Sequence, residues 1–367
     1  MAAAITLGRD WLRRALPGLI VALSVAVAAR WLADSVGHSV FGTGKTPLSP
    51  VLCAVLFGVI WRSTFGVATR LEPGLAWVTT ALLRTGIALV GMRLTLTSVG
   101  QVGLFAIPVV VVCIGTALLL ARVLTKPLQL TSVLSRLLAV GAAVCGCTAV
   151  LAVAPVIGAR KDEMGYAVAC VVLFGLLAML GYPYLAHALF GATPTAAGIF
   201  LGTAIHDTSQ VIGAGLIYSQ QFDSPAALAA ATTAKLLRNL SMVVLIPWFA
   251  WAAARDTSAN ERTLESASAV GLIPMFIWFF IGFVILRTIG DAAVLGADWT
   301  TQWNQLMSAA GLISEFLLTA GMAAVGFGIT FSGFRGIGWR PLLAAMLIAV
   351  TVGVVSLGMT TWVSRWM

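Results

Sequence analysis

The sequence predicts an all-α polytopic membrane protein with about eleven transmembrane helices. Three observations carry this prediction. Of the 367 residues, 60% are hydrophobic and only 10% are charged, whereas a soluble domain carries about 25% charged residues. The mean hydropathy is +1.00. The apolar residues are grouped into long runs separated by short polar segments. Together these features exclude soluble, fibrous, disordered and disulfide-rich classes.

Each predicted helix is an apolar run of about 20 residues, the length that crosses a ~30 Å hydrocarbon core. In chain order the runs are about 15–33, 47–62, 74–92, 101–122, 131–158, 164–189, 195–218, 225–252, 268–288, 304–330 and 340–363. Turn and charge signals separate them, such as Arg70-Leu71-Glu72-Pro73 and Arg255-Asp256. We expect the first run to be retained as a helix, although its basic start is similar to a signal peptide.

The net charge of +9 indicates basic loops on the cytoplasmic side rather than a nucleic-acid partner. With a cytoplasmic N-terminus, the inner loops hold twelve basic residues: Arg9, Arg13, Arg14, Arg62, Arg70, Arg122, Lys126, Arg136, Arg255, Arg262, Arg335 and Arg340. The outer side holds seven: Arg30, Lys45, Arg93, Arg160, Lys161, Arg287 and Arg365. We therefore expect the N-terminus inside and the C-terminus outside, with Arg160-Lys161 on the less favoured side.

An internal repeat relates helices 2–6 to helices 7–11. Ser49-Pro50 matches Thr193-Pro194, and Leu82-Leu83-Arg84 matches Leu236-Leu237-Arg238; further matches join Val102-Gly103-Leu104 to Val270-Gly271-Leu272, and Leu137-Leu138 to Leu317-Leu318. Because a five-helix unit is odd, its second copy enters the membrane from the opposite side, as in many secondary transporters. The alternative is coincidence between apolar sequences. We divide the chain into an extra N-terminal helix (1–40), repeat 1 (41–192) and repeat 2 (193–367).

Glycine-rich stretches in the middle of helices 5 and 10 predict two discontinuous helices that cross near the membrane midplane. They run from Gly141 to Thr148 and from Gly321 to Gly328. We expect breaks near Cys145–Thr148 and Val325–Gly328, and a binding site lined by Cys145, Gly146, Cys147, Thr148, Val325 and Gly326. Backbone N–H groups freed at a break suit an anion. The alternative is that these glycines allow close helix packing. The Cys-x-Cys spacing is a poor metal site, and we expect no metal.

Charges within the predicted helices point to the same site. Arg84 and Arg238 lie at repeat-equivalent positions, Lys235 is one turn before Arg238, and Asn239 follows it. Helix 7 contributes His206, Asp207 and Gln210, and helix 10 contributes Glu315. A positive excess selects an anionic ligand. The alternative is that the arginines pair with Glu315, Asp207 or backbone carbonyls and hold helices together. His206 is either a proton carrier or a hydrogen-bonded core residue.

At these residues the chain resembles the YeiH family of bacterial inner-membrane proteins, often described as sulfate exporters. The resemblance is carried by Gly86–Thr95, Cys145–Pro155, Gly202–Gly215 and Lys235–Asn239. It implies a distant relation to the sodium/proton antiporter and bile-acid symporter superfamily, with helices 4–6 and 9–11 forming the moving core. One departure matters: cation-handling relatives place carboxylates at their crossing helices, where this chain has Cys, Gly and Thr.

The sequence therefore predicts a secondary active transporter of a small sulfate-like or sulfonate-type anion in the bacterial inner membrane. The alternative is a cation/proton antiporter of the same fold, with His206, Asp207 and Glu315 as candidate coupling residues. We expect a coupled proton or sodium ion, contact with membrane lipid and no cofactor, and dimerisation is left open. The chain has three histidines and no H-E-x-x-H or G-x-S-x-G motif, so no enzyme is expected.

Overall fold

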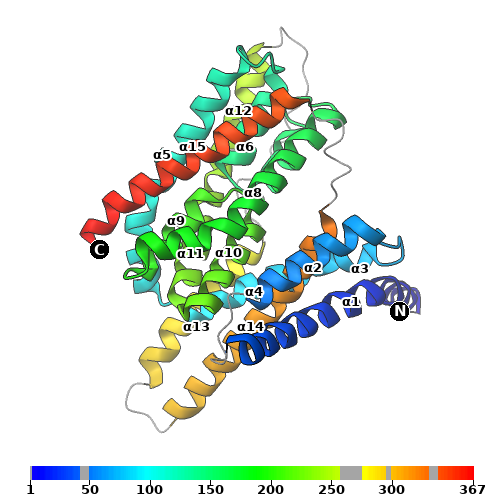
Figure 1. Cartoon of the computed structure of the whole chain (residues 1–367), viewed down its shortest axis with the longest axis vertical. Coiled ribbons are helices and arrows are strands. Elements are labelled where there is room, and N and C mark those ends of the chain that lie inside the picture. The colour runs from blue at the N-terminus through cyan, green and yellow to red at the C-terminus, as the bar shows by residue number, and fades with distance from the viewer. Residues whose placement is uncertain (1, 42–48, 257–274, 295–298, 330–337) are drawn as a thin grey trace. The chain divides into compact units, whose positions relative to one another are not determined.

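The computed structural model describes residues 2–41, 49–256, 275–294, 299–329 and 338–367, and every regular element in these ranges is helical. The α-helices in order are α1 (Ala2–Phe41), α2 (Pro50–Phe65), α3 (Glu72–Trp77), α4 (Leu83–Val90), α5 (Leu96–Thr125), α6 (Ser132–Ala143), α7 (Cys147–Val153), α8 (Lys161–Phe190), α9 (Pro194–Ala204), α10 (Thr208–Phe222), α11 (Pro225–Leu240), α12 (Met242–Asp256), α13 (Met275–Val294), α14 (Thr300–Gly328) and α15 (Trp339–Val363) (Figure 1). A π-helical turn at Val78–Leu82 joins α3 to α4.

The helix lengths confirm an all-α polytopic membrane protein. Within the described residues, eight helical segments are long and apolar enough to cross a bilayer. The other three predicted spans also form helices, but in shorter pieces. The run 47–62 becomes the 16-residue helix α2, while the runs 131–158 and 195–218 are each divided in two. The repeat match at Val270-Gly271-Leu272 and the loop residues Lys45, Arg262 and Arg335 lie outside the described residues.

The chain forms two compact units. Unit 1 comprises Met1–Leu96, Leu216–Pro225 and Trp278–Phe331, and unit 2 comprises Thr97–Gly215, Ala226–Ile277 and Ser332–Met367. The compact units do not follow the expected grouping of helices 4–6 with helices 9–11, because α14 and most of α13 belong to unit 1. Which helices move stays a prediction. The compact units show which helices pack together, but they do not test whether the two halves of the chain are repeats. The repeat boundaries at residues 40 and 192 and the inverted relation of the repeats therefore stay predictions.

The core of unit 1 is built around α14, which corrects one sequence prediction. The helix runs unbroken from Thr300 to Gly328, so the break expected at Val325–Gly328 is absent from it. Its glycines serve close packing instead. A Cβ added to Gly321 would lie 2.8 Å from Leu83 Cβ, and a Cβ added to Gly58 on α2 would lie 2.7 Å from Phe327 N. Small residues that let backbones approach are typical of helix contacts in membranes.

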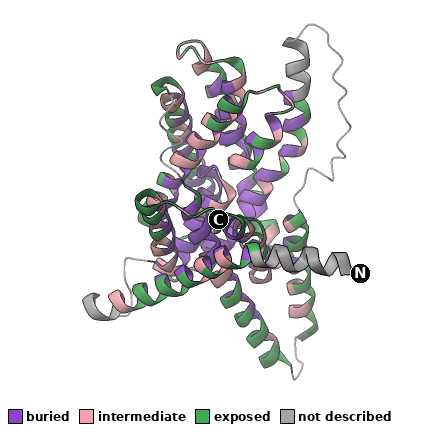
Figure 2. Cartoon of the chain, turned by 90° about the vertical axis from the view of Figure 1, so that its right-hand side faces the viewer, coloured by how far each residue is buried: buried purple, intermediate pink, exposed green. Residues whose placement is uncertain are grey.

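The core of unit 2 brings α9 and α11 into similarly close contact. A Cβ added to Gly198 would lie 2.6 Å from Ala230 Cβ, and one added to Gly202 would lie 2.8 Å from Ala234 Cβ. Buried residues lie on the inner faces of the helices, and exposed residues lie on the outer faces (Figure 2). The close packing of α9 on α11 places Lys235 and Arg238, the next residues of α11, beside the C-terminal end of α9.

Candidate functional site

The first interruption lies between α6 and α7, where the sequence predicts it. The helix ends at Ala143, Val144 adopts φ −122° and ψ −96°, and Gly146 adopts a positive φ of +67° before α7 begins at Cys147. That left-handed conformation favours glycine, because a Cβ clashes with the following carbonyl. The Cys145 side chain is buried with its Sγ 3.3 Å from Met242 Sδ, while Cys147 and Thr148 are at least partly exposed.

The second interruption lies in a helix that the sequence analysis took as continuous. The run 195–218 stops at Ala204 and resumes at Thr208, with Ile205, His206 and Asp207 between α9 and α10. The two interruptions are adjacent in unit 2, since Asp207 Oδ2 lies 3.4 Å from the Cys147 N–H nitrogen. We call Val144–Gly146 and Ile205–Asp207, together with Lys235 and Arg238, the interrupted-helix site.

Lys235 binds the C-terminal ends of both interrupted helices. Its Nζ donates to Val144 O at 2.8 Å, to Ile205 O at 3.2 Å and to His206 O. Three acceptors match the three hydrogens of an ammonium ion, whereas a neutral amine has two. The side chain is fully buried, so its charge is compensated by carbonyl dipoles and not by water.

Arg238, one turn further along α11, holds the same two helix ends. Its Nε donates to Ala143 O at 2.7 Å, its Nη1 to Thr203 O at 2.7 Å and Ile205 O at 3.3 Å, and its Nη2 to Ala142 O. The last carbonyls of a helix have no partner within it and carry partial negative charge. The two cations therefore satisfy six such carbonyls, which is the carbonyl-pairing alternative raised by the sequence.

Asp207 lies at the opposite, N-terminal ends of the interrupted helices. Its Oδ1 accepts from the Ser209 N–H at 2.9 Å and from the Ser209 hydroxyl at 2.5 Å. Its Oδ2 faces the Cys147 N–H. A carboxylate is the favoured cap at a helix N-terminus. Unlike the two cations, Asp207 is partly exposed, as are Thr208 and Ser209. The accessible side of the interrupted-helix site is thus its N-terminal side.

Three buried polar side chains surround the interruptions with part of their hydrogen-bonding capacity unused. The His206 ring, 4% exposed, lines a small hollow with Cys170 and Phe174 from α8. Gln210 donates to Val172 O at 3.0 Å and Asn239 donates to Thr208 Oγ1 at 3.2 Å. In the part of the chain that the structure describes, His206 Nδ1, Gln210 Oε1 and Asn239 Oδ1 have no hydrogen-bond partner.

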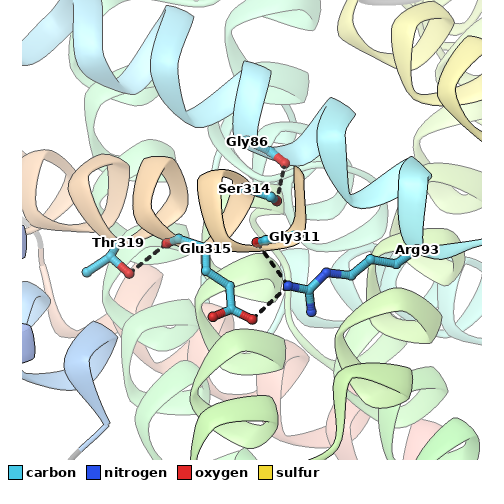
Figure 3. A network of polar contacts seen from close by, with 6 residues as sticks. All are labelled: Gly86, Arg93, Gly311, Ser314, Glu315 and Thr319. Carbon is cyan, nitrogen blue, oxygen red and sulfur yellow. Dashed lines mark hydrogen bonds and ion pairs between the residues drawn. The ribbon is translucent and has the colours of Figure 1, made fainter. Parts of the chain in front are cut away.

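The remaining predicted site residues belong to unit 1. Arg84 is exposed on α4, in contrast to the fully buried Arg238 that the repeat equates with it. Glu315 forms an ion pair with Arg93, whose Nη2 lies 2.7 Å from Glu315 Oε1 and donates to Gly311 O at 3.0 Å (Figure 3). Val325 and Gly326 lie within the continuous helix α14. Their convergence with the unit 2 residues stays a prediction.

The site offers no cluster of metal ligands. Among the described residues, no three His, Cys, Asp or Glu side chains come together in a way that would hold a metal ion. All five cysteines are free thiols. The chemistry available at the interrupted-helix site is therefore hydrogen bonding and charge compensation by helix ends, two cations and one carboxylate.

Interrupted helices meeting inside a multi-pass helical protein define a membrane protein of transporter-like architecture. The chain belongs to the family described as "Conserved hypothetical protein 698", whose model matches residues 17–345, and the resemblance read from the sequence is confirmed. It is 31% identical to a UPF0324 membrane protein of Nitratidesulfovibrio vulgaris over 91% of this chain and 89% of that protein. A UPF0324 membrane protein of Chlorobaculum tepidum is 30% identical over 96% and 90% of the two chains. No solved structure matches the chain.

Proposed function

We propose that the chain is a secondary active transporter of a small anion, working by alternating access in the bacterial inner membrane with its N-terminus in the cytoplasm. The observation that carries the proposal is the meeting of two interrupted helices at the interrupted-helix site. Discontinuous helices place polar backbone groups at the depth of the bilayer, where they bind substrates and coupling ions. The sulfate-like or sulfonate-type oxyanions predicted from the sequence are the first substrates to test.

The charge balance at this site favours an anion. The C-terminal ends of α6 and α9 carry partial negative charge, and the N-terminal ends of α7 and α10 carry partial positive charge, so the four ends offset one another. Among the described residues at the interruptions, Lys235 and Arg238 then outweigh Asp207 by one positive charge. A bound anion would neutralise this excess in a low-dielectric surrounding, where an uncompensated charge is costly.

The anion would bind on the N-terminal side, and not on the lysine and arginine side chains as the sequence alone predicts. The donors of Lys235 and most of those of Arg238 already bind carbonyls. The Cys147 N–H, the Ser209 N–H and the Ser209 hydroxyl are instead held by one partly exposed carboxylate, Asp207. Protonation of Asp207 would free these donors for the substrate, which couples anion binding to a proton.

Asp207 also supports the second candidate, a cation/proton antiporter of the same fold. Asp207 is a partly exposed carboxylate, and the nearby backbone carbonyl of Ile205 already binds Lys235. In that mechanism Asp207 would exchange a proton for the transported cation. The two candidates differ in what a neutral side chain at position 207 does.

The test uses the purified chain in proteoliposomes, with uptake of radiolabelled sulfate and a sulfonate measured at several internal and external pH values. Asp207→Asn keeps the size of the side chain and an acceptor for Ser209 but cannot take up a proton. Asp291→Asn is the matched control, because it makes the same chemical change at the ion pair with Arg287 in unit 1.

If the chain is a proton-coupled anion transporter, the wild type takes up the anion in response to a pH gradient. Asp207→Asn should then still exchange anion between compartments of equal pH, but its accumulation of anion in response to a pH gradient should fall at least tenfold. Asp291→Asn should behave like the wild type. Absence of anion uptake by the wild type, together with sodium- or potassium-driven proton flux that Asp207→Asn abolishes, would establish the antiporter instead.

A further inference from the structure

Unit 2 contains a second cavity, at the end of α5 and away from the helix interruptions. Its volume is about 730 Å³, and it is lined by the last turns of α5, the first turns of α6 and the aromatic pair Trp248 and Phe249 of α12. Ligand-binding pockets commonly measure about 300–1,000 Å³. The cavity is therefore large enough for the headgroup of a lipid and the upper part of a chain.

The polar end of this cavity is cationic. Arg122, Lys126 and Arg136 line it, and none of the described lining residues is acidic. Arg122 and Lys126 are exposed, one turn apart at the end of α5. Two of the three hydroxyls in the wall already bind within the protein, since Thr125 Oγ1 and Ser135 Oγ lie 2.6 Å apart and Ser135 donates to Ala121 O. The cations are thus the groups that would select a ligand.

The apolar part of the cavity lining includes exposed side chains of α5. Leu118, Leu119 and Val123 line the cavity, and Leu119 and Val123 are 66% and 58% exposed. On a 30-residue apolar helix of mean hydropathy 2.7, an exposed apolar face is the face that contacts lipid. One cavity therefore combines cations at the end of a membrane-spanning helix with apolar side chains along it.

We propose that this cavity is a binding site for an acidic phospholipid. Arg122, Lys126 and Arg136 bind the phosphate, an acyl chain lies along Leu119 and Val123, and Trp248 lies at the level of the headgroups. Arginine offers bidentate hydrogen bonds to phosphate and lysine offers a point charge. Basic pockets between helix ends are the sites where membrane proteins hold anionic lipid headgroups, and tryptophan is enriched at that depth.

The test is native mass spectrometry of the full chain in detergent, with equal amounts of phosphatidylglycerol and phosphatidylcholine of the same acyl length. The wild type should retain phosphatidylglycerol in preference, and Arg122→Ala with Lys126→Ala should reduce that retention about tenfold or more. Lys161→Ala with Arg365→Ala is the matched control. It removes the same charge from exposed positions of unit 2 that do not line the cavity, and it should retain the lipid like the wild type.

Leu119→Trp gives a second measurement that keeps all three cations. It fills the apolar part of the cavity, so it should lower retention of a long-chain phosphatidylglycerol more than that of a short-chain one. Equal retention of both headgroups by the wild type would overturn the proposal, as would unchanged retention in the double alanine variant. Displacement of phosphatidylglycerol by an equal concentration of inorganic phosphate would also overturn it, in favour of a site for free anions.

Discussion

The two units hold charged side chains in different ways. In unit 1, Arg93 forms a side-chain ion pair with Glu315, which lies on the unbroken helix α14 (Figure 3). In unit 2, Lys235 and Arg238 donate hydrogen bonds to the backbone carbonyls of two interrupted helices. A side-chain pair can form without disturbing either helix, whereas the unit 2 arrangement requires that hydrogen bonds within both helices be given up. Only the second arrangement leaves backbone groups available for a ligand.

This difference gives the two regions different roles. The ion pair of unit 1 satisfies its own members and needs nothing further. The interrupted-helix site has fixed cations on one side and a partly exposed carboxylate on the other, so one of its three charges can change partner. We infer that the charged pair of unit 1 stabilises the fold and that the charges of unit 2 take part in transport. The following predictions test that contrast, from the largest expected effect to the smallest.

Removal of Arg238 should have the largest effect on stability. Arg238→Ala leaves the carbonyls of Ala142, Ala143 and Thr203 without their donor and empties a fully buried volume. Breaking a buried charge network by deleting one partner costs about 3–5 kcal/mol. The unfolding temperature in detergent, followed by fluorescence, should fall by several degrees or more. Arg84→Ala, at the exposed position that the predicted repeat pairs with Arg238, should lower the unfolding temperature much less. Equal unfolding temperatures for both variants would show that Arg238 does not hold the helix ends.

Alanine variants of two glycines compare the cost of backbone strain with the cost of a steric clash at the interruption. Gly146 and Gly158 have nearly the same positive φ, +67° and +65°, but a Cβ on Gly146 would lie 2.6 Å from Asp207 Oδ2 while one on Gly158 meets nothing within 4 Å. Gly158→Ala should therefore cost about 1 kcal/mol from the left-handed backbone alone. Gly146→Ala should cost about 2–3 kcal/mol, because the collision adds to it. Thermal unfolding of the two variants measures the difference, and equal costs would contradict a tight contact with Asp207.

The ion pair of unit 1 should show a modest coupling. Arg93→Gln, Glu315→Gln and the double variant form a cycle that isolates the pair. Both side chains are partly exposed, 17% and 28%, so we expect a coupling of about 0.5–1 kcal/mol. The free energies of unfolding should show that the double variant costs less than the sum of the single ones. A coupling above about 3 kcal/mol would mean that this pair contributes as much to the free energy of unfolding as Arg238 does at the interrupted-helix site.

The smallest effect is expected at Ser314, whose hydroxyl donates to Gly86 O on α4 at 2.8 Å (Figure 3). Hydrogen bonds between membrane helices average about 0.6 kcal/mol, so Ser314→Ala should cost about that much. Thr319 lies on the same helix, but its hydroxyl donates to Glu315 O one turn earlier. Thr319→Ser keeps that bond within the helix and should unfold nearly like the wild type. Identical unfolding of both variants would remove Ser314 as a link between α14 and α4.

Much of the fold follows from apolar length, which the sequence displays directly. Runs such as 101–122, 164–189 and 340–363 become α5, α8 and α15 with their ends shifted by a few residues. The break at Cys145 was predictable because Gly146 stands in the middle of an apolar run and takes a conformation that other residues avoid. Local sequence could find these features because local chemistry causes them.

Glycine alone could not distinguish a break from a close contact. Gly321 and Gly326 have the same composition signal as Gly141 and Gly146, yet they lie in a continuous helix that packs tightly on α2 and α4. Whether a glycine marks a break or a close contact depends on the helix that packs against it, and the sequence of one helix does not reveal that neighbour. Conversely, the break before α10 contains no glycine or proline. Its signal was a helix cap in mid-run, Asp207 followed three residues later by Gln210.

The partners of Lys235 and Arg238 were the least predictable part. The sequence indicated that both lie on one side of a helix, and both do contact Ile205 O. Their ligands, however, are backbone carbonyls on α6 and α9, and a carbonyl leaves no mark in a sequence because every residue has one. The sequence interpretation that these side chains bind the anion directly depended on their being unoccupied, which only the packing could decide.

The way Lys235 and Arg238 are compensated also bears on how the chain is made. Segment Pro225–Phe249 has a mean hydropathy of 1.3, the lowest of the eight candidate spans in the described part of the chain. Each of the two cations adds about 2.5–3.5 kcal/mol to the free energy of its insertion. The carbonyls that offset this cost belong to α6 and α9, which are synthesised before α11. The ribosome therefore delivers the two acceptor ends to the translocon first. The order of helices along the chain therefore places both acceptor helices before the segment whose charges they bind.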